Sequence, residues 1–196
     1  VQVPLFNGRH ELTDSVFLWQ SGTKYRLNVH DADMNPVEAL YGITEKGMAV
    51  IEGNLFLKGE KSIEARTSYG MGEVIADALN HGAEHLVISL GGLDSFDGGA
   101  GMLQALGARF YDDEAQPIDV TEGPRVLKYI RKVDFSDLHS GLQSARIQVM
   151  SDFDSKLYGR HSEIMQTYEA YGLMREKAAE IDNLVWYFSE ILKSEE

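Results

Sequence analysis

Apolar and polar residues alternate near the start of the chain with the two-residue period of β-strands. Residues 24–29 (KYRLNV) show this alternation, and residues 39–43 and 48–51 are short apolar runs of the kind that form strands. Residues 33–36 (DMNP), after the first of these segments, have the composition of a turn. The pattern predicts a β-meander within a β-rich lobe over residues 1–60.

Further along the chain the period becomes that of helices alternating with strands. One apolar stripe with helical spacing consists of Met71, Val74, Ile75, Ala78 and Leu79. Gly82 follows as a helix stop, and residues 85–90 (HLVISL) then predict a strand buried on both faces. A glycine-rich segment over residues 91–101, a short helix through Leu106 and a strand over residues 108–111 complete a β-loop-α unit.

The last strand and helix of the pattern lie towards the C-terminus. Residues 146–150 (RIQVM) predict a strand that ends at the acidic segment 151–154 (SDFD). An amphipathic helix is predicted over residues 173–194. Its apolar stripe consists of Met174, Ala178, Ile181, Val185, Phe188 and Leu192.

This order of elements predicts an α/β fold with a mixed, mostly parallel sheet flanked by helices. The chain has no repeats, low-complexity tracts or obvious linkers. We therefore expect one unit over residues 1–196, in which the lobe of residues 1–60 joins an α/β core over residues 61–196.

Composition and charge narrow the function classes. With 18 basic and 31 acidic residues, the chain has a formal net charge of -13, which disfavours nucleic acid and anionic membranes as partners. The absence of cysteine excludes disulfides, thiolate zinc sites and cysteine nucleophiles. The sequence contains neither a membrane-spanning apolar run nor the pattern of a signal peptide, so we expect a soluble, cytoplasmic protein.

The strongest local candidate for chemistry is the glycine-rich loop of residues 91–99 (GGLDSFDGG), between a buried strand and a helix. Glycines there allow backbone N–H groups to approach an anion, and the terminus of the following helix adds favourable partial charge. Asp94 and Asp97 are interpreted either as cation ligands or as helix caps. The alternative is a turn whose glycines serve only the backbone, since the pattern matches neither a P-loop nor a dinucleotide fingerprint.

Paired acidic residues offer a second candidate site. Asp152 and Asp154 lie two apart at a strand end, so both side chains can approach the glycine loop if the sheet is parallel, and such a pair suits Mg²⁺. The alternative is a solvated strand end. Asp31 and Asp33 have the same spacing within a predicted turn, where turn chemistry is the better interpretation. His81 and the histidine four residues later are separated by a helix stop, which argues against a metal site.

Residues 97–110 (DGGAGMLQALGARF) form a long and specific run, preceded by residues 67–73 (TSYGMGE) and by Gly91 and Gly92. These runs resemble the central region of bacterial glycerate kinases of the glycerate 2-kinase type. Weaker matches follow the family's order, and they are residues 35–43 (NPVEALYGI), 134–138 (DFSDL) and 151–154 (SDFD). The resemblance covers nearly the whole chain.

The resemblance implies two α/β lobes with an active site in the cleft between them, and ATP- and Mg²⁺-dependent phosphorylation of D-glycerate. This chain corresponds to the inserted lobe and its flanks. Carried over to matching positions, the resemblance makes Asp97 the catalytic candidate. The candidate metal ligands are Asp97, Asp152 and Asp154. The substrate- or phosphate-binding candidates are Gly91, Gly92, Ser95, Gly98 and Gly99. ATP and Mg²⁺ are implied by the resemblance alone.

The chain departs from the family's pattern at several polar positions. The family's Ala-Asp-Gly-Gly-Glu-Gly-Thr is here residues 6–12 (FNGRHEL), and its Gly-Gly-Ser-Ala-Thr-Asn-Asp-Gly-Gly is here residues 91–99, without the first Ser or the Asn. The family's opening Asp-Ser-Phe-Lys-Gly-Ser pattern and closing Thr-Gly-Glu-Gly-Arg pattern have no counterpart. Phosphoryl transfer depends on positioning and charge neutralisation, so these losses are expected to be severe.

Two hypotheses follow from the sequence. In the first, the chain is part of a glycerate kinase that turns over only with the missing lobe, which either a partner protein or residues absent from this sequence supply. In the second, it is a non-catalytic module that binds a small-molecule ligand or a protein. We expect no kinase turnover by the chain alone, and a weak residual Mg²⁺ site at Asp97, Asp152 and Asp154. The sequence leaves homodimer formation open.

Overall fold

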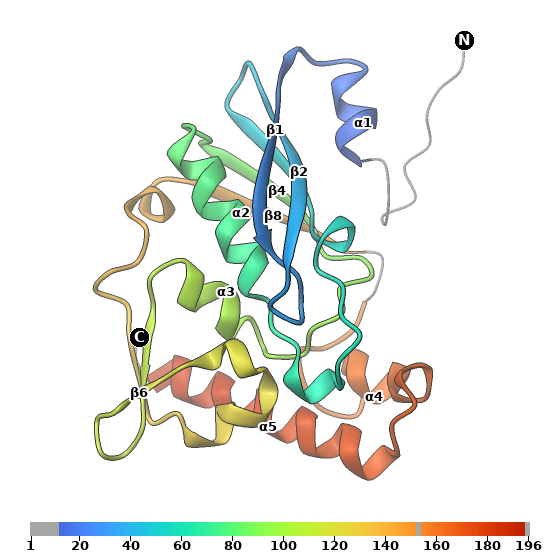
Figure 1. The fold of residues 1–196 in the computed structure, drawn as a ribbon, viewed down its shortest axis with the longest axis vertical. Helices are drawn as coiled ribbons and strands as arrows, with labels where there is room; N and C mark the ends of the chain where they lie inside the picture. The colour runs from blue at the N-terminus through green and yellow to red at the C-terminus, as the bar shows by residue number, and fades with distance from the viewer. Residues whose placement is uncertain (1–11, 152–153, 195–196) are drawn as a thin grey trace.

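A computed structural model describes residues 12–151 and 154–194, and its larger sheet has five strands in the order β1-β2-β3-β4-β8 (Figure 1). Register pairs show that β1 and β2 are antiparallel, as are β2 and β3, whereas β3, β4 and β8 are parallel neighbours. Four of the five strands therefore point the same way, which confirms the mixed, mostly parallel sheet. The strands are β1 (Gly22–His30), β2 (Pro36–Thr44), β3 (Met48–Glu52), β4 (His85–Ser89) and β8 (Arg146–Met150).

The three early strands are continuous with the later ones. β3 pairs with β4 over five residues, from Met48 opposite His85 to Glu52 opposite Ser89. The strands expected in a lobe over residues 1–60 thus form three of the five strands of a sheet that β4 and β8 complete.

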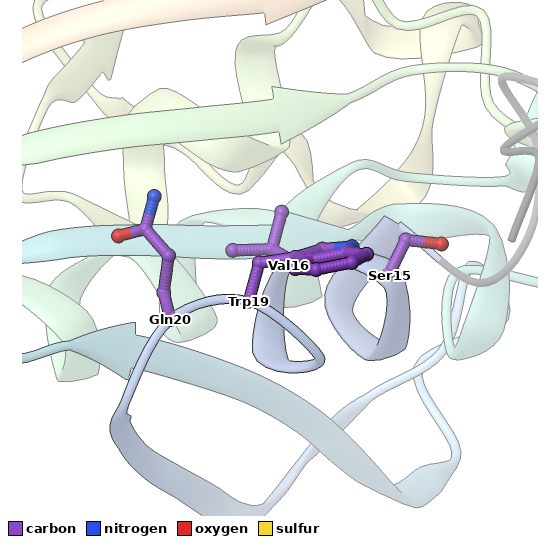
Figure 2. A pocket seen from close by; sticks show the side chains of 4 residues that line it. All are labelled: Ser15, Val16, Trp19 and Gln20. Atoms are coloured by element: carbon purple, nitrogen blue, oxygen red, sulfur yellow. The ribbon is translucent and has the colours of Figure 1, made fainter. Parts of the chain in front are cut away.

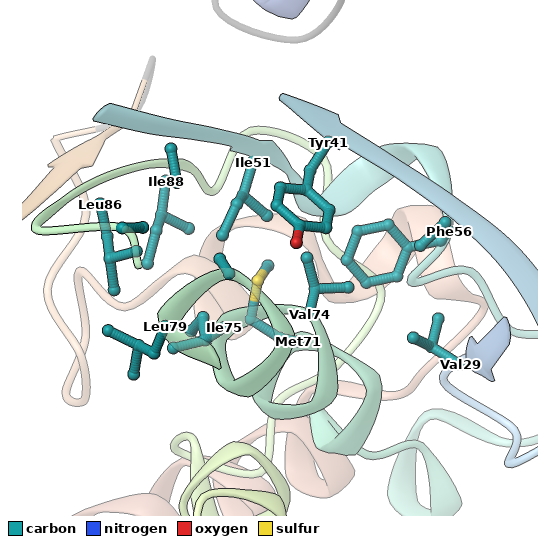
Figure 3. Close-up of a cluster of buried hydrophobic side chains, with 14 of the residues drawn as sticks. Val29, Tyr41, Ile51, Phe56, Met71, Val74, Ile75, Leu79, Leu86 and Ile88 are labelled. Carbon is teal, nitrogen blue, oxygen red and sulfur yellow. The ribbon is translucent and has the colours of Figure 1, made fainter. Parts of the chain in front are cut away.

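Helix α2 (Tyr69–Asn80) covers one face of this sheet and forms the main core with it. Its predicted apolar stripe is confirmed, because Met71, Val74 and Ala78 are almost fully buried. Figure 3 shows Met71 and Val74 pointing from α2 towards the sheet, where they share the core with Ile51. Burial of such side chains contributes about 1.5–3 kcal/mol each, which explains why the helix forms here.

The opposite face carries the short helix α1 (Leu12–Phe17), which packs on Val50 and Val87. Glu52, 1% exposed at the end of β3, accepts hydrogen bonds from the backbone N–H groups of Leu12 (3.0 Å) and Thr13 (2.9 Å). A carboxylate at this position satisfies the free N–H groups of a helix start and interacts favourably with its dipole. The buried glutamate therefore fixes α1 to the sheet.

A second, three-stranded sheet lies beside the first, in the order β6-β5-β7. Both of its strand pairs are antiparallel. In the core of this sheet, Phe110 packs with Phe188 of the C-terminal helix, and the centroids of the two rings lie 6.0 Å apart. Its strands are β5 (Arg109–Tyr111), β6 (Pro117–Ile118) and β7 (Lys132–Asp134).

The C-terminal helix α5 (Arg175–Ser194) confirms the helix predicted over residues 173–194. Ala178, Ile181, Val185 and Phe188 of its stripe are buried. The prediction that Met174 belongs to this stripe was wrong. Met174 precedes the helix and is 74% exposed, so it contributes nothing to the packed stripe.

Short helices connect these elements. The α-helices are α3 (Ala100–Ala105) and α4 (Glu163–Thr167). The 3₁₀ helices are η1 (Gly53–Leu55), η2 (Ile63–Ala65), η3 (Val120–Glu122), η4 (Pro124–Tyr129), η5 (Ser140–Gln143) and η6 (Tyr168–Tyr171). Across the part of the chain that the structure describes, every helix is too short or too polar to traverse a bilayer.

Candidate functional site at the glycine-rich loop

The glycine-rich loop begins where β4 and β8 end side by side. The N–H of Leu90 donates to the carbonyl of Met150 at 2.9 Å, just beyond the parallel pair. The predicted approach of the acidic pair to the glycine loop depends on these two strand ends being neighbours, and the parallel pairing shows that they are. Ligands of open α/β sheets usually bind at such a carboxyl edge.

Asp97 is the best-anchored carboxylate of the loop, and it is 1% exposed. One oxygen accepts from Ser68 N (2.8 Å), Ser68 Oγ (2.9 Å), Gly101 N (3.1 Å) and Thr67 Oγ1 (3.3 Å), while the other accepts from Gly99 N (3.0 Å). The carboxylate thus accepts five hydrogen bonds from within the protein. It joins the loop to the starts of α2 and α3, which is the helix-capping interpretation of Asp97.

Two glycines of the motifs allow α2 and α3 to approach closely. A Cβ at Gly72 would lie 2.4 Å from the carbonyl oxygen of Met102, and one at Gly101 would lie 2.0 Å from Thr67 Oγ1. Real Cβ atoms do not occupy such positions without a shift of the backbone. The specific runs at residues 67–73 and 97–110 therefore encode one tight helix–helix contact around Asp97.

The middle of the loop is held by apolar contacts. Leu93 packs on the main core, and the Phe96 ring meets Tyr171 edge-on with centroids 5.5 Å apart. Gly98 has a φ of 62° and packs against Phe188. The binding candidates Gly91, Gly92, Ser95, Gly98 and Gly99 thus lie in one anchored loop, in which Gly91 is buried and the others are half-buried.

Basic side chains lie beside this loop, and the sequence pattern did not predict their position. Lys58 Nζ donates to the carbonyl of Gly92 at 2.8 Å. Arg66, whose side chain is only 12% exposed, has Nη1 at 3.8 Å from Asp94 Oδ2. The available signal was the grouping of Lys58, Lys61 and Arg66 within nine positions of an otherwise acidic chain.

The predicted metal ligands are only partly placed. Asp154 is exposed after β8, and Asp152 lies outside the described residues. Among residues 12–151 and 154–194, no three acidic or histidine side chains are grouped as a metal ion would need. Because Asp97 already binds five internal donors, the residues described do not fit a Mg²⁺ centre by themselves. The Mg²⁺ site at Asp97, Asp152 and Asp154 stays a prediction.

The other candidate residues take structural positions. Asp31 Oδ1 accepts from the backbone N–H groups of Asp33 (2.8 Å) and Asn35 (2.9 Å), which is turn chemistry. His81 Nδ1 lies 3.4 Å from Asp77 Oδ2 at the end of α2. The Tyr41 hydroxyl donates to Asp77 at 2.6 Å, and burial together with this carboxylate raises the pKa of Tyr41.

Two surface hollows lie away from the glycine loop. One, of about 340 Å³, lies on α1 and is lined by Ser15, Val16, Trp19 and Gln20, with the Trp19 ring extending across Val16 (Figure 2). A second, of about 360 Å³, lies along β5 and β6 and includes Gln104 and Asp119. Both are open and contain no residue of the 91–99 loop. We therefore place the candidate site by its loop geometry and charges.

The sheet, with its glycine-rich loop at the carboxyl edge of the parallel strands, places the chain in the class of open α/β folds. The model of the glycerate kinase family matches residues 1–196. The chain belongs to the glycerate kinase family.

Individual relatives agree with this assignment. A glycerate kinase of Bacillus cereus (strain ATCC 10987 / NRS 248) is 32% identical over 98% of this chain and 52% of its own length. A glycerate 2-kinase of Escherichia coli (strain K12) is 30% identical over the same shares. A crystal structure described as glycerate kinase 2 from Salmonella typhimurium LT2 superposes with a TM-score of 0.88 at 27% identity, over 98% of this chain and 53% of that one. The chain thus spans about half the length of the relatives it matches.

Proposed function

We propose that the chain is the sheet-and-loop half of a glycerate kinase, and that it performs ATP-dependent phosphorylation of D-glycerate only when the other half of the fold is supplied. The observation that carries the proposal is the anchored glycine loop on a fold that matches the relatives over about half their length. The loop and its basic side chains are suited to hold an anionic ligand at the carboxyl edge. ATP, Mg²⁺, the cytoplasmic location and the protein partner belong to this proposal.

This chain's own residues have defined tasks in such an enzyme. Asp97 positions the loop by holding the starts of α2 and α3, while Lys58 and Arg66 supply positive charge beside it. Mg²⁺, where bound, would neutralise charge on the transferred phosphoryl group. Since the residues described do not form its site, we assign them no step that passes through the metal.

One observation favours a second candidate function, a non-catalytic ligand- or protein-binding module. Asp97, the residue that the resemblance made catalytic, is fully buried and has both oxygens bonded within the fold. A group in that position serves structure whether or not phosphoryl transfer takes place. A scaffold of this kind can retain its fold and a ligand site after its chemistry is lost.

Turnover distinguishes the two functions. The chain is incubated with D-glycerate, ATP and Mg²⁺ in a coupled assay for ADP release, alone and with the missing half of a relative. The kinase proposal predicts no ADP release by the chain alone and D-glycerate-dependent release in the mixture. No release in either condition, with the relative's own halves active, would support the binding module instead.

A further inference from the structure

Asp33 has an unusual environment for a carboxylate that is only 4% exposed. Its Oδ2 accepts hydrogen bonds from the backbone N–H groups of Glu60 (2.5 Å) and Lys61 (3.0 Å). Its Oδ1 is buried and has no hydrogen-bond partner among the described residues. An unsatisfied buried oxygen on a charged group is costly, so its neighbourhood requires an explanation.

The neighbour of this oxygen is the guanidinium group of Arg66. Arg66 Nε lies 4.0 Å from Asp33 Oδ1 and donates instead to the carbonyl of Lys61 at 2.9 Å. On its other side, Arg66 Nη1 lies 3.8 Å from Asp94 Oδ2. Both distances to carboxylates exceed that of a hydrogen bond. Arg66 is therefore held between two acids and bonded directly to neither.

The backbone keeps this space open. A Cβ at Gly59 would lie 2.7 Å from Arg66 Cδ and 2.8 Å from Asp33 Oδ1, so a side chain there would displace both groups. Asp33 is fixed by two backbone donors, whereas Asp94 lies on the half-buried glycine loop. Asp33 is therefore a buried acid held by the backbone, whereas Asp94 is a partly exposed one.

We propose that Arg66 is the anion-binding side chain of the glycine-loop site and that it receives a carboxylate or phosphate group in place of Asp94. This inference rests on the proposed function, since it names the ligand chemistry of the same site. A guanidinium group presents a planar fork of donors that matches both anions. The hydrogen bond from Arg66 Nε to the carbonyl of Lys61 orients the fork, and Asp33 lies behind it as a counter-charge. Lys58 adds a second positive charge beside Gly92.

Asp94 then acts as an internal competitor for the ligand anion. Its carboxylate supplies negative charge next to Arg66 as long as the site is empty, which lowers the net cost of a buried cation. A ligand anion must displace it and overcome its repulsion. Removal of the Asp94 charge is therefore expected to tighten anion binding, an effect opposite to that of removing the Arg66 charge.

Calorimetric titration of the chain with inorganic phosphate, and separately with D-glycerate, tests this assignment. Arg66→Gln should weaken binding of the anion about tenfold or more, the loss expected for a charge-assisted hydrogen bond. Asp94→Asn should tighten it several-fold. Arg26→Gln is the matched control, because Arg26 is 68% exposed and pairs with Glu38 on the strand surface. Circular dichroism verifies that each variant retains the fold.

The two probes distinguish the sources of the anion. Binding of D-glycerate alone assigns Arg66 to a substrate carboxylate, and binding of phosphate assigns it to a phosphoryl group. Failure of the unsubstituted chain to bind either, equal affinity of Arg66→Gln and Arg26→Gln, or Asp94→Asn affinity no tighter than the control would overturn the proposal. The titration measures binding and the kinase assay measures turnover, so the anion-site proposal and the kinase proposal can be contradicted independently of each other.

Discussion

At the scale of single residues, the site shows why local sequence predicts some roles and misses others. Glycines and acids after a buried strand marked the loop of residues 91–99, and the structure places that loop at the carboxyl edge. The burial of Asp97 could not be predicted, because it depends on donors that lie about 30 positions away at Thr67 and Ser68. The position of Arg66 could not be predicted for the same reason, because its neighbours Asp33 and Asp94 belong to two distant segments of the chain.

Asp97→Asn should destabilise the protein strongly. The substitution replaces a buried anion that accepts five hydrogen bonds and turns an amide donor towards other donors. We expect a loss of about 3 kcal/mol in the free energy of unfolding, in the range for breaking a buried charged network. Urea unfolding measures it, with Asp154→Asn as the exposed control, expected to change stability by less than about 0.5 kcal/mol. Equal stability of the two variants would contradict the anchoring role.

Asp119 should contribute a pH-dependent part of the stability. Partial desolvation acts to raise the pKa of Asp119, but hydrogen bonds from Thr121 and Gln104 outweigh it and leave the pKa below its usual range. Because the folded-state pKa is depressed, this stabilisation is complete above the unfolded-state value and disappears as pH falls through the folded-state value.

Urea midpoints of the unsubstituted protein and of Asp119→Asn, measured from neutral to acidic pH, check that sign. The midpoint of the variant should be lower at neutral pH, and the gap should narrow as the solution is acidified below the usual range of aspartate. A gap that widened in acid would contradict the depressed pKa.

At the scale of elements, periodicity identified what packs locally, whereas pairing over long distances had to come from the structure. The stripes from Met71 to Leu79 and from Ala178 to Phe188 predicted α2 and α5, since each buries one face of a single helix. The pairing of β3 with β4 joins segments separated by α2, and no local pattern specifies its register. The small strands β6 and β7 are two and three residues long, too short to produce a readable period.

The apolar stripe of α5 includes Phe188 but not Met174, so the two residues should differ in their contribution to stability. Phe188 is 1% exposed between the helix and the second sheet, and Met174 is 74% exposed ahead of the helix. Phe188→Ala should reduce the free energy of unfolding by about 3–5 kcal/mol, whereas Met174→Ala should change it by less than about 0.5 kcal/mol. Thermal and urea unfolding measure both. A comparable cost at the two positions would mean that the stripe extends through Met174, as its spacing alone suggested.

At the scale of the whole molecule, the chain reproduces a glycerate kinase fold over nearly all of its own length and about half that of its relatives. Among the described residues, the candidate site presents one anchored loop with two basic side chains and no complete metal centre. Phosphoryl transfer requires charge neutralisation and positioning from more than one direction. Under the proposed function, the groups that perform the transfer therefore lie on the half of the fold that the relatives have and the matched segment does not include.

A complementation experiment tests most directly whether the chain is the sheet-and-loop half of a glycerate kinase. The opening and closing segments of the Bacillus cereus relative, joined in one chain, are titrated into this protein with D-glycerate, ATP and Mg²⁺. The positive control is the middle segment of that relative. The account predicts no ADP release by either part alone and a saturable, D-glycerate-dependent rate in the mixture. Turnover by this chain alone at about 1 s⁻¹ or faster, within the range of ordinary enzymes, would contradict it, as would an inactive mixture beside an active control.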